Sequence, residues 1–276
     1  MNSVNAIRES LRNDYSRLIA IVTLIFVSVL AYWLVTLQIV PGNSSSDVGA
    51  LILASVISVI FWALVLILVF GLVLRNAFFA FLETLRHRLW AKILFPSYLV
   101  IHLLVYGLVL ERILVSIFGQ PGYNVGQLVF IQLGSAFYPH TLFNALIQMT
   151  LSPSIVMFIP PFYGIELTLF SFCSAIIIAV LIIVHLERLS RYAGLIRRAG
   201  GSVMYPLIAV IGGASCCISL PGIFLDFTPL ASSILLVPMW VDVLNVLYYL
   251  LPVSVIVLLA IGLRQFEFLT VSGDTK

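Results

Sequence analysis

Long apolar stretches dominate the pattern of hydrophobic and polar positions along this chain. Crossing the hydrocarbon core of a bilayer takes a helix of about 20 residues, and helices are the open structures that satisfy their own backbone in lipid. We therefore predict five membrane helices with well-marked apolar runs. Their ranges are Leu18–Val40, Gly49–Leu74, Ile93–Phe118, Ile165–Leu186 and Leu244–Leu263.

Two further apolar regions are interrupted by helix-breaking residues. Ser202–Pro221 is a sixth candidate span, although Pro206 lies near its start. Val125–Phe162 is broken by several prolines and favours a re-entrant or surface hairpin on the outer side. The expected fold is an all-α integral membrane protein, a bundle of about six transmembrane helices with one or two broken or re-entrant helical hairpins. One polytopic domain, residues 18–264, would contain them.

The composition supports lipid as the main solvent of the chain. Apolar residues make up 62% and charged residues 9%, against about 45–50% and about 25% in soluble domains. A chain with so few polar side chains cannot cover itself for water. The net charge of +3 is too small to indicate a nucleic-acid partner. We expect a multi-pass protein of the cell membrane.

The distribution of basic residues predicts the orientation. Arginines precede the first span, four basic residues lie in Arg75–Lys92, and four arginines lie in Glu187–Gly201. Arg112 is the one basic residue between Ile93 and Glu187. By the positive-inside rule, the N-terminus and both basic segments are cytoplasmic. The possible glycosylation triplet Asn43-Ser44-Ser45 then falls outside, which agrees.

Two cytoplasmic segments have the spacing of helices that lie on a membrane surface. Residues 1–17 alternate charged and apolar positions, and Arg75–Lys92 mixes aromatic with basic side chains. Both are typical of anchors for helix ends. Arg75–Lys92 and the basic loop Glu187–Gly201 are also candidate docking sites for a cytoplasmic partner. Residues 265–276 form a short, nearly neutral polar tail.

A weak internal similarity relates segments 76 to 79 positions apart. Leu110-Glu111-Arg112 resembles Leu186-Glu187-Arg188, and Gly134-Ser135-Ala136 resembles Gly213-Ala214-Ser215. The first pair falls on opposite sides of the membrane, as in the inverted repeats of many secondary transporters. Short matches of common residues also arise by chance. An inverted repeat would place Ser202–Pro221 as a re-entrant segment and the C-terminus outside.

Ionisable residues inside spans are the first candidates for a functional site. Each costs about 2.5–3.5 kcal/mol to insert at a helix centre. His102 lies near mid-membrane by helix rise, and Glu111 and Arg112 lie toward the outer end of the same helix. His102 could equally form a helix–helix hydrogen bond, and Arg112 could reach the outer surface with its long side chain.

Metal and haem sites find less support. Cys216, Cys217 and His140 offer thiolate and imidazole ligands suited to copper or zinc, but their spacing matches no ligand motif. Glycine, alanine and serine beside the cysteines also suit close helix packing. His102 and His185 differ by roughly 15 Å in depth, which argues against a shared haem. No cofactor is expected.

Three functions remain open from the sequence. Phosphate-binding glycine loops, nucleophile elbows and zinc-protease pairs are absent, so the sequence gives no evidence of catalysis. The first expectation is a membrane-transport component, either a secondary permease or a membrane subunit of a translocating complex. The second is a non-catalytic accessory subunit of a respiratory or metalloenzyme complex, and the third is a metal-handling protein using Cys216–Cys217. Partners would be the bilayer, other membrane subunits or further copies of the chain.

Overall fold

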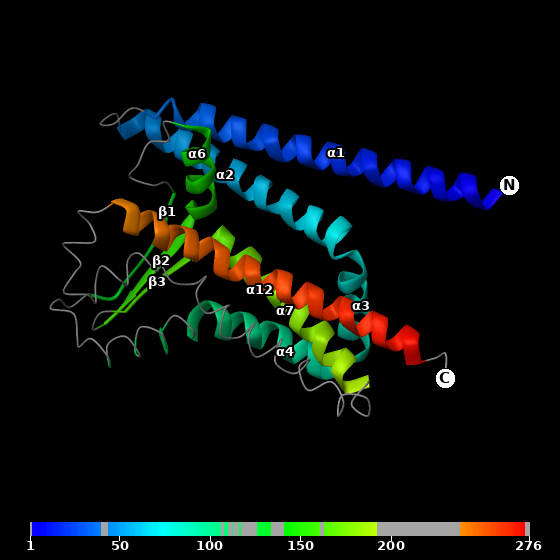
Figure 1. Cartoon of the computed structure of the whole chain (residues 1–276). Helices are drawn as coiled ribbons and strands as arrows, with labels where there is room; N and C mark the ends of the chain where they lie inside the picture. Colours follow the sequence, from blue (N-terminus) through cyan, green and yellow to red (C-terminus); the bar gives the residue numbers. More distant parts are fainter. Residues whose placement is uncertain are drawn as a thin grey trace. The chain divides into compact units, whose positions relative to one another are not determined.

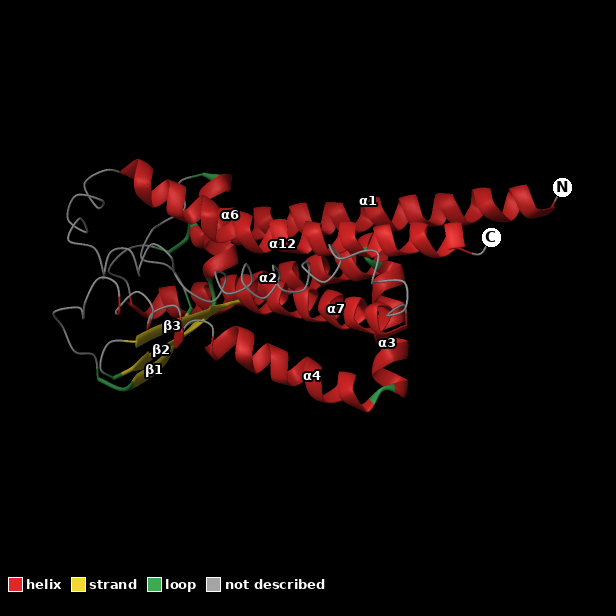
Figure 2. Cartoon of the chain, turned by 60° about the horizontal axis from the view of Figure 1, so that its bottom comes forward, coloured by secondary structure: helices red, strands yellow, loops and turns green. Residues whose placement is uncertain are grey.

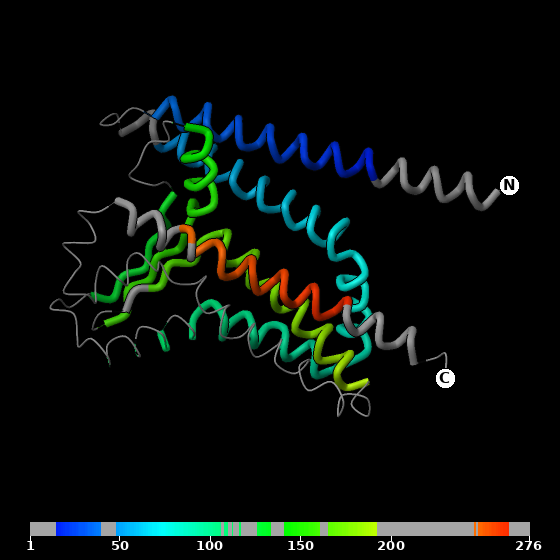
Figure 3. Tube along the Cα trace, viewed as in Figure 1, coloured from blue at the N-terminus to red at the C-terminus, as the bar shows by residue number. Residues whose placement is uncertain are grey.

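The structure, a computed structural model, describes most but not all of the chain (Figure 3). The backbone is described for residues 2–39, 44–105, 108–109, 112, 116, 126–133, 141–160, 163–191 and 238–273. Side chains are described for the same residues except 2–14, 44–47, 163–164, 238–245, 247 and 265–273. Glu111, His140, Cys216, Cys217 and the candidate span Ser202–Pro221 therefore lie outside the described residues, as does most of the internal similarity.

Helices make up most of the described chain, and one small sheet accompanies them (Figures 1 and 2). The helices are α1 (Asn2–Thr36), α2 (Ser44–Leu68), α3 (Arg75–His87), α4 (Leu89–Val100), α6 (Leu142–Leu151), α7 (Leu169–Arg191) and α12 (Pro238–Gly273). Two π-helical turns, η1 (Val69–Val73) and η2 (Ile101–Val105), directly continue α2 and α4. The strands are β1 (Leu128–Gln132), β2 (Ser154–Ile159) and β3 (Tyr163–Thr168).

Three described helices are long and apolar enough to cross a membrane. They comprise Tyr15–Thr36 of α1, Val48–Val73 of α2 with η1, and all of α7. Helix α3 and the following segment, α4 with η2, form a bent pair. If this pair counts as one span, the described chain has four spans. The membrane class is therefore supported, whereas the expected number of about six spans is not confirmed. The predicted span Leu244–Leu263 lies within α12.

The chain divides into two compact units. In the first unit (Met1–Asn76, Ile131–Ser154 and Thr168–Phe170), α1 packs against α2, and α6 contacts both. Serines on α2 make these contacts close. Ser58 is fully buried and donates a hydrogen bond to the Met149 carbonyl of α6 at 3.1 Å. Ser55 donates to the Leu133 carbonyl at 3.2 Å.

The second unit (Ala77–Phe130, Ile155–Leu167 and Ser171–Lys276) has α7 as its core. Most of α7 is buried, and Ile178 and Leu181 have no exposed surface. Arg188, near the end of α7, donates a hydrogen bond to the Leu263 carbonyl of α12 at 2.8 Å. Extensive burial accounts for the long apolar run Ala175–Val184 in the middle of α7.

The segment Val125–Phe162 contains strands, where the sequence predicted a helical hairpin. It holds β1, α6 and β2, and β3 follows directly to complete a sheet in the order β1-β2-β3. All-α was therefore too narrow a description of the fold. The strand sequences are rich in β-branched and aromatic residues, such as Ser154-Ile-Val-Met-Phe-Ile, which suit a pleated surface. Pro153 and Pro160 bound β2, because proline cannot donate to the ladder.

Helix α7 is offset from the range that the sequence predicted. It begins at Leu169, because Ile165–Thr168 belongs to β3. It ends at Arg191, so the first five residues of the predicted loop Glu187–Gly201 are helical. A run of apolar residues cannot by itself mark the point where a strand becomes a helix. The later residues of that loop lie outside the described part of the chain.

The cytoplasmic surface segment predicted at Arg75–Lys92 contains a sharp bend. Arg88 separates α3 from α4, and the axes of the two helices differ in direction by 116°. Helix α3 buries Ala77, Phe81 and Thr84 and exposes charged residues on its other face. Helix α1, by contrast, continues without a break from Asn2 to Thr36. Residues 2–17 therefore extend the first span along the same helix.

Candidate functional site

His102 lies where the helix that began at Leu89 changes its hydrogen-bonding pattern. Pro96 inside α4 lacks the N–H that an α-helix needs at that position. One turn later the chain forms η2, whose residues include His102. Such π-helical turns occur frequently at functional sites, because they displace side chains from the regular helical positions.

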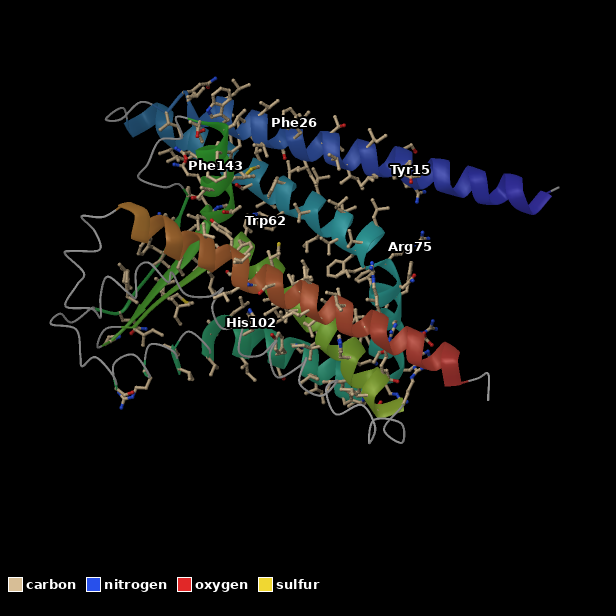
Figure 4. The ribbon with its side chains drawn as sticks, in the orientation of Figure 1. Tyr15, Phe26, Trp62, Arg75, His102 and Phe143 are labelled. Carbon is tan, nitrogen blue, oxygen red and sulfur yellow. The ribbon has the colours of Figure 1, made fainter. Side chains whose placement is uncertain are left out.

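The His102 imidazole is completely buried and has a specific partner. The Tyr98 hydroxyl and His102 Nδ1 lie 3.0 Å apart, and the two ring centroids are separated by 5.3 Å. Tyr98 is one helical turn earlier and is also buried, so the pair lies on one face of the helix. Figure 4 shows His102 on the α4–η2 segment. A hydroxyl and an imidazole in contact can exchange the donor and acceptor roles, which makes the pair capable of holding or passing a proton.

The other predicted residues do not join His102 in the described structure. Arg112 is exposed, consistent with a side chain that reaches a surface. Glu111 lies outside the described residues, as do the possible metal ligands His140, Cys216 and Cys217. Across the described part of the chain, no group of three metal-ligating side chains comes together. Cys173, the described cysteine, is a buried free thiol on α7.

A second set of buried polar groups lies at the end of α7. His185 is fully buried, and its Nδ1 lies 2.9 Å from the Leu181 carbonyl. Because a carbonyl oxygen only accepts, Nδ1 carries the hydrogen. Its Nε2, when the ring is neutral, is then an acceptor. Through Nδ1, the imidazole thus bonds within its own helix.

Glu187 is buried between two arginines at the same end of α7. Its Oε1 accepts a hydrogen bond from Arg191 Nε at 2.8 Å and lies 3.6 Å from Arg88 Nη2. The side chain of Glu187 is 6% exposed, whereas those of Arg88 and Arg191 are 54% and 56% exposed. The carboxylate therefore links the α3–α4 bend to α7 within the second unit. We call these three residues the arginine–glutamate cluster.

Sequence reasoning missed two features of this arrangement. Tyr98 was not a candidate, although its spacing of four residues from His102 is the spacing at which side chains meet on a helix. Glu187 was placed in a basic cytoplasmic loop, because the apolar run ends one residue earlier. The spacing of Glu187 and Arg191 is a signal for a helical ion pair, but nothing in the sequence predicts the contribution of Arg88.

Comparison of the chain with protein-family models, with curated proteins and with solved structures finds no match.

Proposed function

We propose that this protein is a membrane-transport component in which the Tyr98–His102 pair forms part of a polar path. The observation that carries the proposal is a fully buried histidine, hydrogen-bonded at 3.0 Å, in a π-helical turn within an apolar helix. Buried ionisable groups in membrane helices are expensive and commonly mark ion pathways or proton relays. The irregular turn next to Pro96 adds to this support, since irregular backbone at membrane depth needs protein or a water-filled cavity around it.

A transport path and a packed interior predict different access of water to His102. A path brings water to the pair, so a thiol at that position ionises and reacts with charged reagents. A packed interior, as expected for an accessory subunit, keeps water away. The experiment introduces His102→Cys into a chain whose three native cysteines are replaced by serine. Labelling with a charged methanethiosulfonate reagent is then measured in vesicles whose two sides are both accessible.

Two matched positions calibrate the labelling. Val100 lies two residues before His102, and its side chain is 55% exposed. If α4 spans the membrane, the bilayer covers this side chain, so a cysteine at position 100 should remain unlabelled. Glu83→Cys on the exposed face of α3 should be labelled. If His102→Cys disturbs folding, Tyr98→Cys tests the same path. We expect the cysteine at position 102 or 98 to be labelled at a rate closer to that of the cysteine at position 83 than to that of the cysteine at position 100. Rates as low as at position 100 in both variants would reject the transport proposal and favour the accessory subunit.

A further inference from the structure

Basic side chains of the second unit gather around the α3–α4 bend and the end of α7. Residues 77–92, 185–191 and 263–264 carry two carboxylates, Glu83 and Glu187. The six guanidinium and ammonium groups in these ranges are Arg86, Arg88, Lys92, Arg188, Arg191 and Arg264. Contacts from Arg88 to Glu187 and from Arg188 to the Leu263 carbonyl join these segments. The result is a surface with a strong excess of positive charge, which attracts anions.

The arginine–glutamate cluster gives this surface a defined centre. Glu187 Oε1 lies 2.8 Å from Arg191 Nε and 3.6 Å from Arg88 Nη2, so one buried carboxylate holds two guanidinium groups near each other. More than half of each arginine side chain remains exposed. Guanidinium groups bind phosphate oxygens through paired N–H donors, which a flexible ammonium group does not reproduce.

Exposed apolar side chains beside the cluster indicate the depth at which it lies. Phe79 and Leu82 on α3, and Leu89 and Trp90 at the start of α4, are 57%, 42%, 73% and 37% exposed. On α3, Phe79 and Leu82 lie among exposed charged side chains, and such a mixture of basic and apolar side chains with a nearby tryptophan is typical of the membrane–water interface. The 116° bend sets α3 closer to the membrane plane than to its normal, if α4 follows the normal. The membrane–water interface is the level at which the phosphates of lipid headgroups lie.

We infer that Arg88 and Arg191, held by Glu187, form a binding site for the phosphate group of an anionic phospholipid. The exposed apolar residues on α3 and α4 contact the acyl chains of the same leaflet. Glu187 acts as a positioning residue, because it orders the two arginines without touching the lipid. This site is separate from the Tyr98–His102 pair and does not depend on a transport function.

The test measures the thermal unfolding midpoint of the full-length protein in a non-ionic detergent. Phosphatidylglycerol, phosphatidylcholine or inorganic phosphate is titrated in. We expect a saturable rise with phosphatidylglycerol and none with the other two. Arg88→Gln together with Arg191→Gln should raise the phosphatidylglycerol concentration needed for half of the rise by about 10- to 100-fold, since charge-assisted hydrogen bonds are lost. Arg86→Gln with Lys92→Gln is the matched control, because it removes the same charge from the same surface. This control should change the phosphatidylglycerol concentration at half of the rise only slightly.

Several outcomes would overturn the site. Equal effects of the two double variants would show diffuse attraction to a charged surface. An equal rise with phosphatidylcholine would remove the requirement for an anion, and an equal rise with inorganic phosphate would identify a soluble ligand. If the double glutamine variant does not fold, Arg88→Lys with Arg191→Lys retains the charge and removes the paired donors. It should then weaken lipid binding, and unchanged binding would contradict the proposal.

Discussion

Two buried ionisable side chains in this protein are stabilised by different means. His102 bonds to a neutral hydroxyl one turn away on its own helix, whereas Glu187 neutralises its charge with arginines from two segments. The difference follows from charge. A neutral imidazole needs only hydrogen-bond partners for its two ring nitrogens, while a buried carboxylate also needs a cation to offset its loss of hydration. The Tyr98–His102 contact is therefore local to one helix, whereas Glu187 depends on a contact between two segments.

The energetic coupling between Tyr98 and His102 is a prediction at this scale. A double-mutant cycle with Tyr98→Phe and His102→Asn should give a coupling of about 0.5–1.5 kcal/mol, the usual net value of a hydrogen bond. Unfolding by sodium dodecyl sulfate in mixed micelles measures the four stabilities. Additive losses would show that the two side chains do not stabilise each other. The cycle cancels the loss of packing that each single substitution causes.

At the scale of elements, helices of similar composition have different surroundings. Most of α7 is buried, whereas few of the apolar side chains of α2 are. Both sequences are long apolar runs, so hydropathy identifies the two helices without distinguishing them. Serines mark the buried face of α2: Ser55 and Ser58 are buried, while Val56, Val59 and Ile60 between and beside them are exposed. Small residues at such contacts let helix backbones approach closely.

This contact predicts a contrast between two substitutions on α2. Ser58→Leu should destabilise the protein by about 1–3 kcal/mol, because the larger side chain has no space against Met149 and a hydrogen bond is lost. Ala63→Leu adds a larger side chain to an exposed position of the same helix. It should change stability by less than about 0.5 kcal/mol. Unfolding in mixed micelles compares the two variants. If Ser58→Leu lowered the stability as little as Ala63→Leu does, Ser58 would lie on a lipid-facing surface instead.

At the scale of the molecule, the basic residues predict an orientation that is open to direct test. The N-terminus and Arg75–Lys92 should face the cytoplasm, and the loop around Asn43–Ser45 should face outward. Single cysteines at Ser45 and at Glu83, in the background without native cysteines, report this by labelling with an impermeant maleimide in intact cells. Ser45→Cys should react at once, and Glu83→Cys only after the membrane is permeabilised. The reverse pattern would invert the topology and move the lipid site to the outer leaflet.

Much of the element list and part of the candidate site follow from the sequence. Runs of apolar residues located the spans within α1, within α2 with η1, and in α7 to within a few residues, because membrane helices need a minimum length of apolar chain. His102 was recognisable as a buried polar group for the same reason. The sheet was not recognisable, since short apolar runs suit strands and buried helices equally. Its pairing joins β2 to a strand on either side, and local sequence does not encode such pairing.

The sequence by itself determined that much of this chain is apolar enough to favour lipid over water, because solvent preference is a sum over single residues. It also located the three longest apolar spans, since a membrane helix forms its backbone hydrogen bonds within one segment. Only the tertiary structure decided which apolar helix is buried within protein, which side chain pairs with His102, and which segments supply the arginines around Glu187. These are contacts between residues distant along the chain or hidden in an irregular turn, and their energy depends on geometry that no single segment carries.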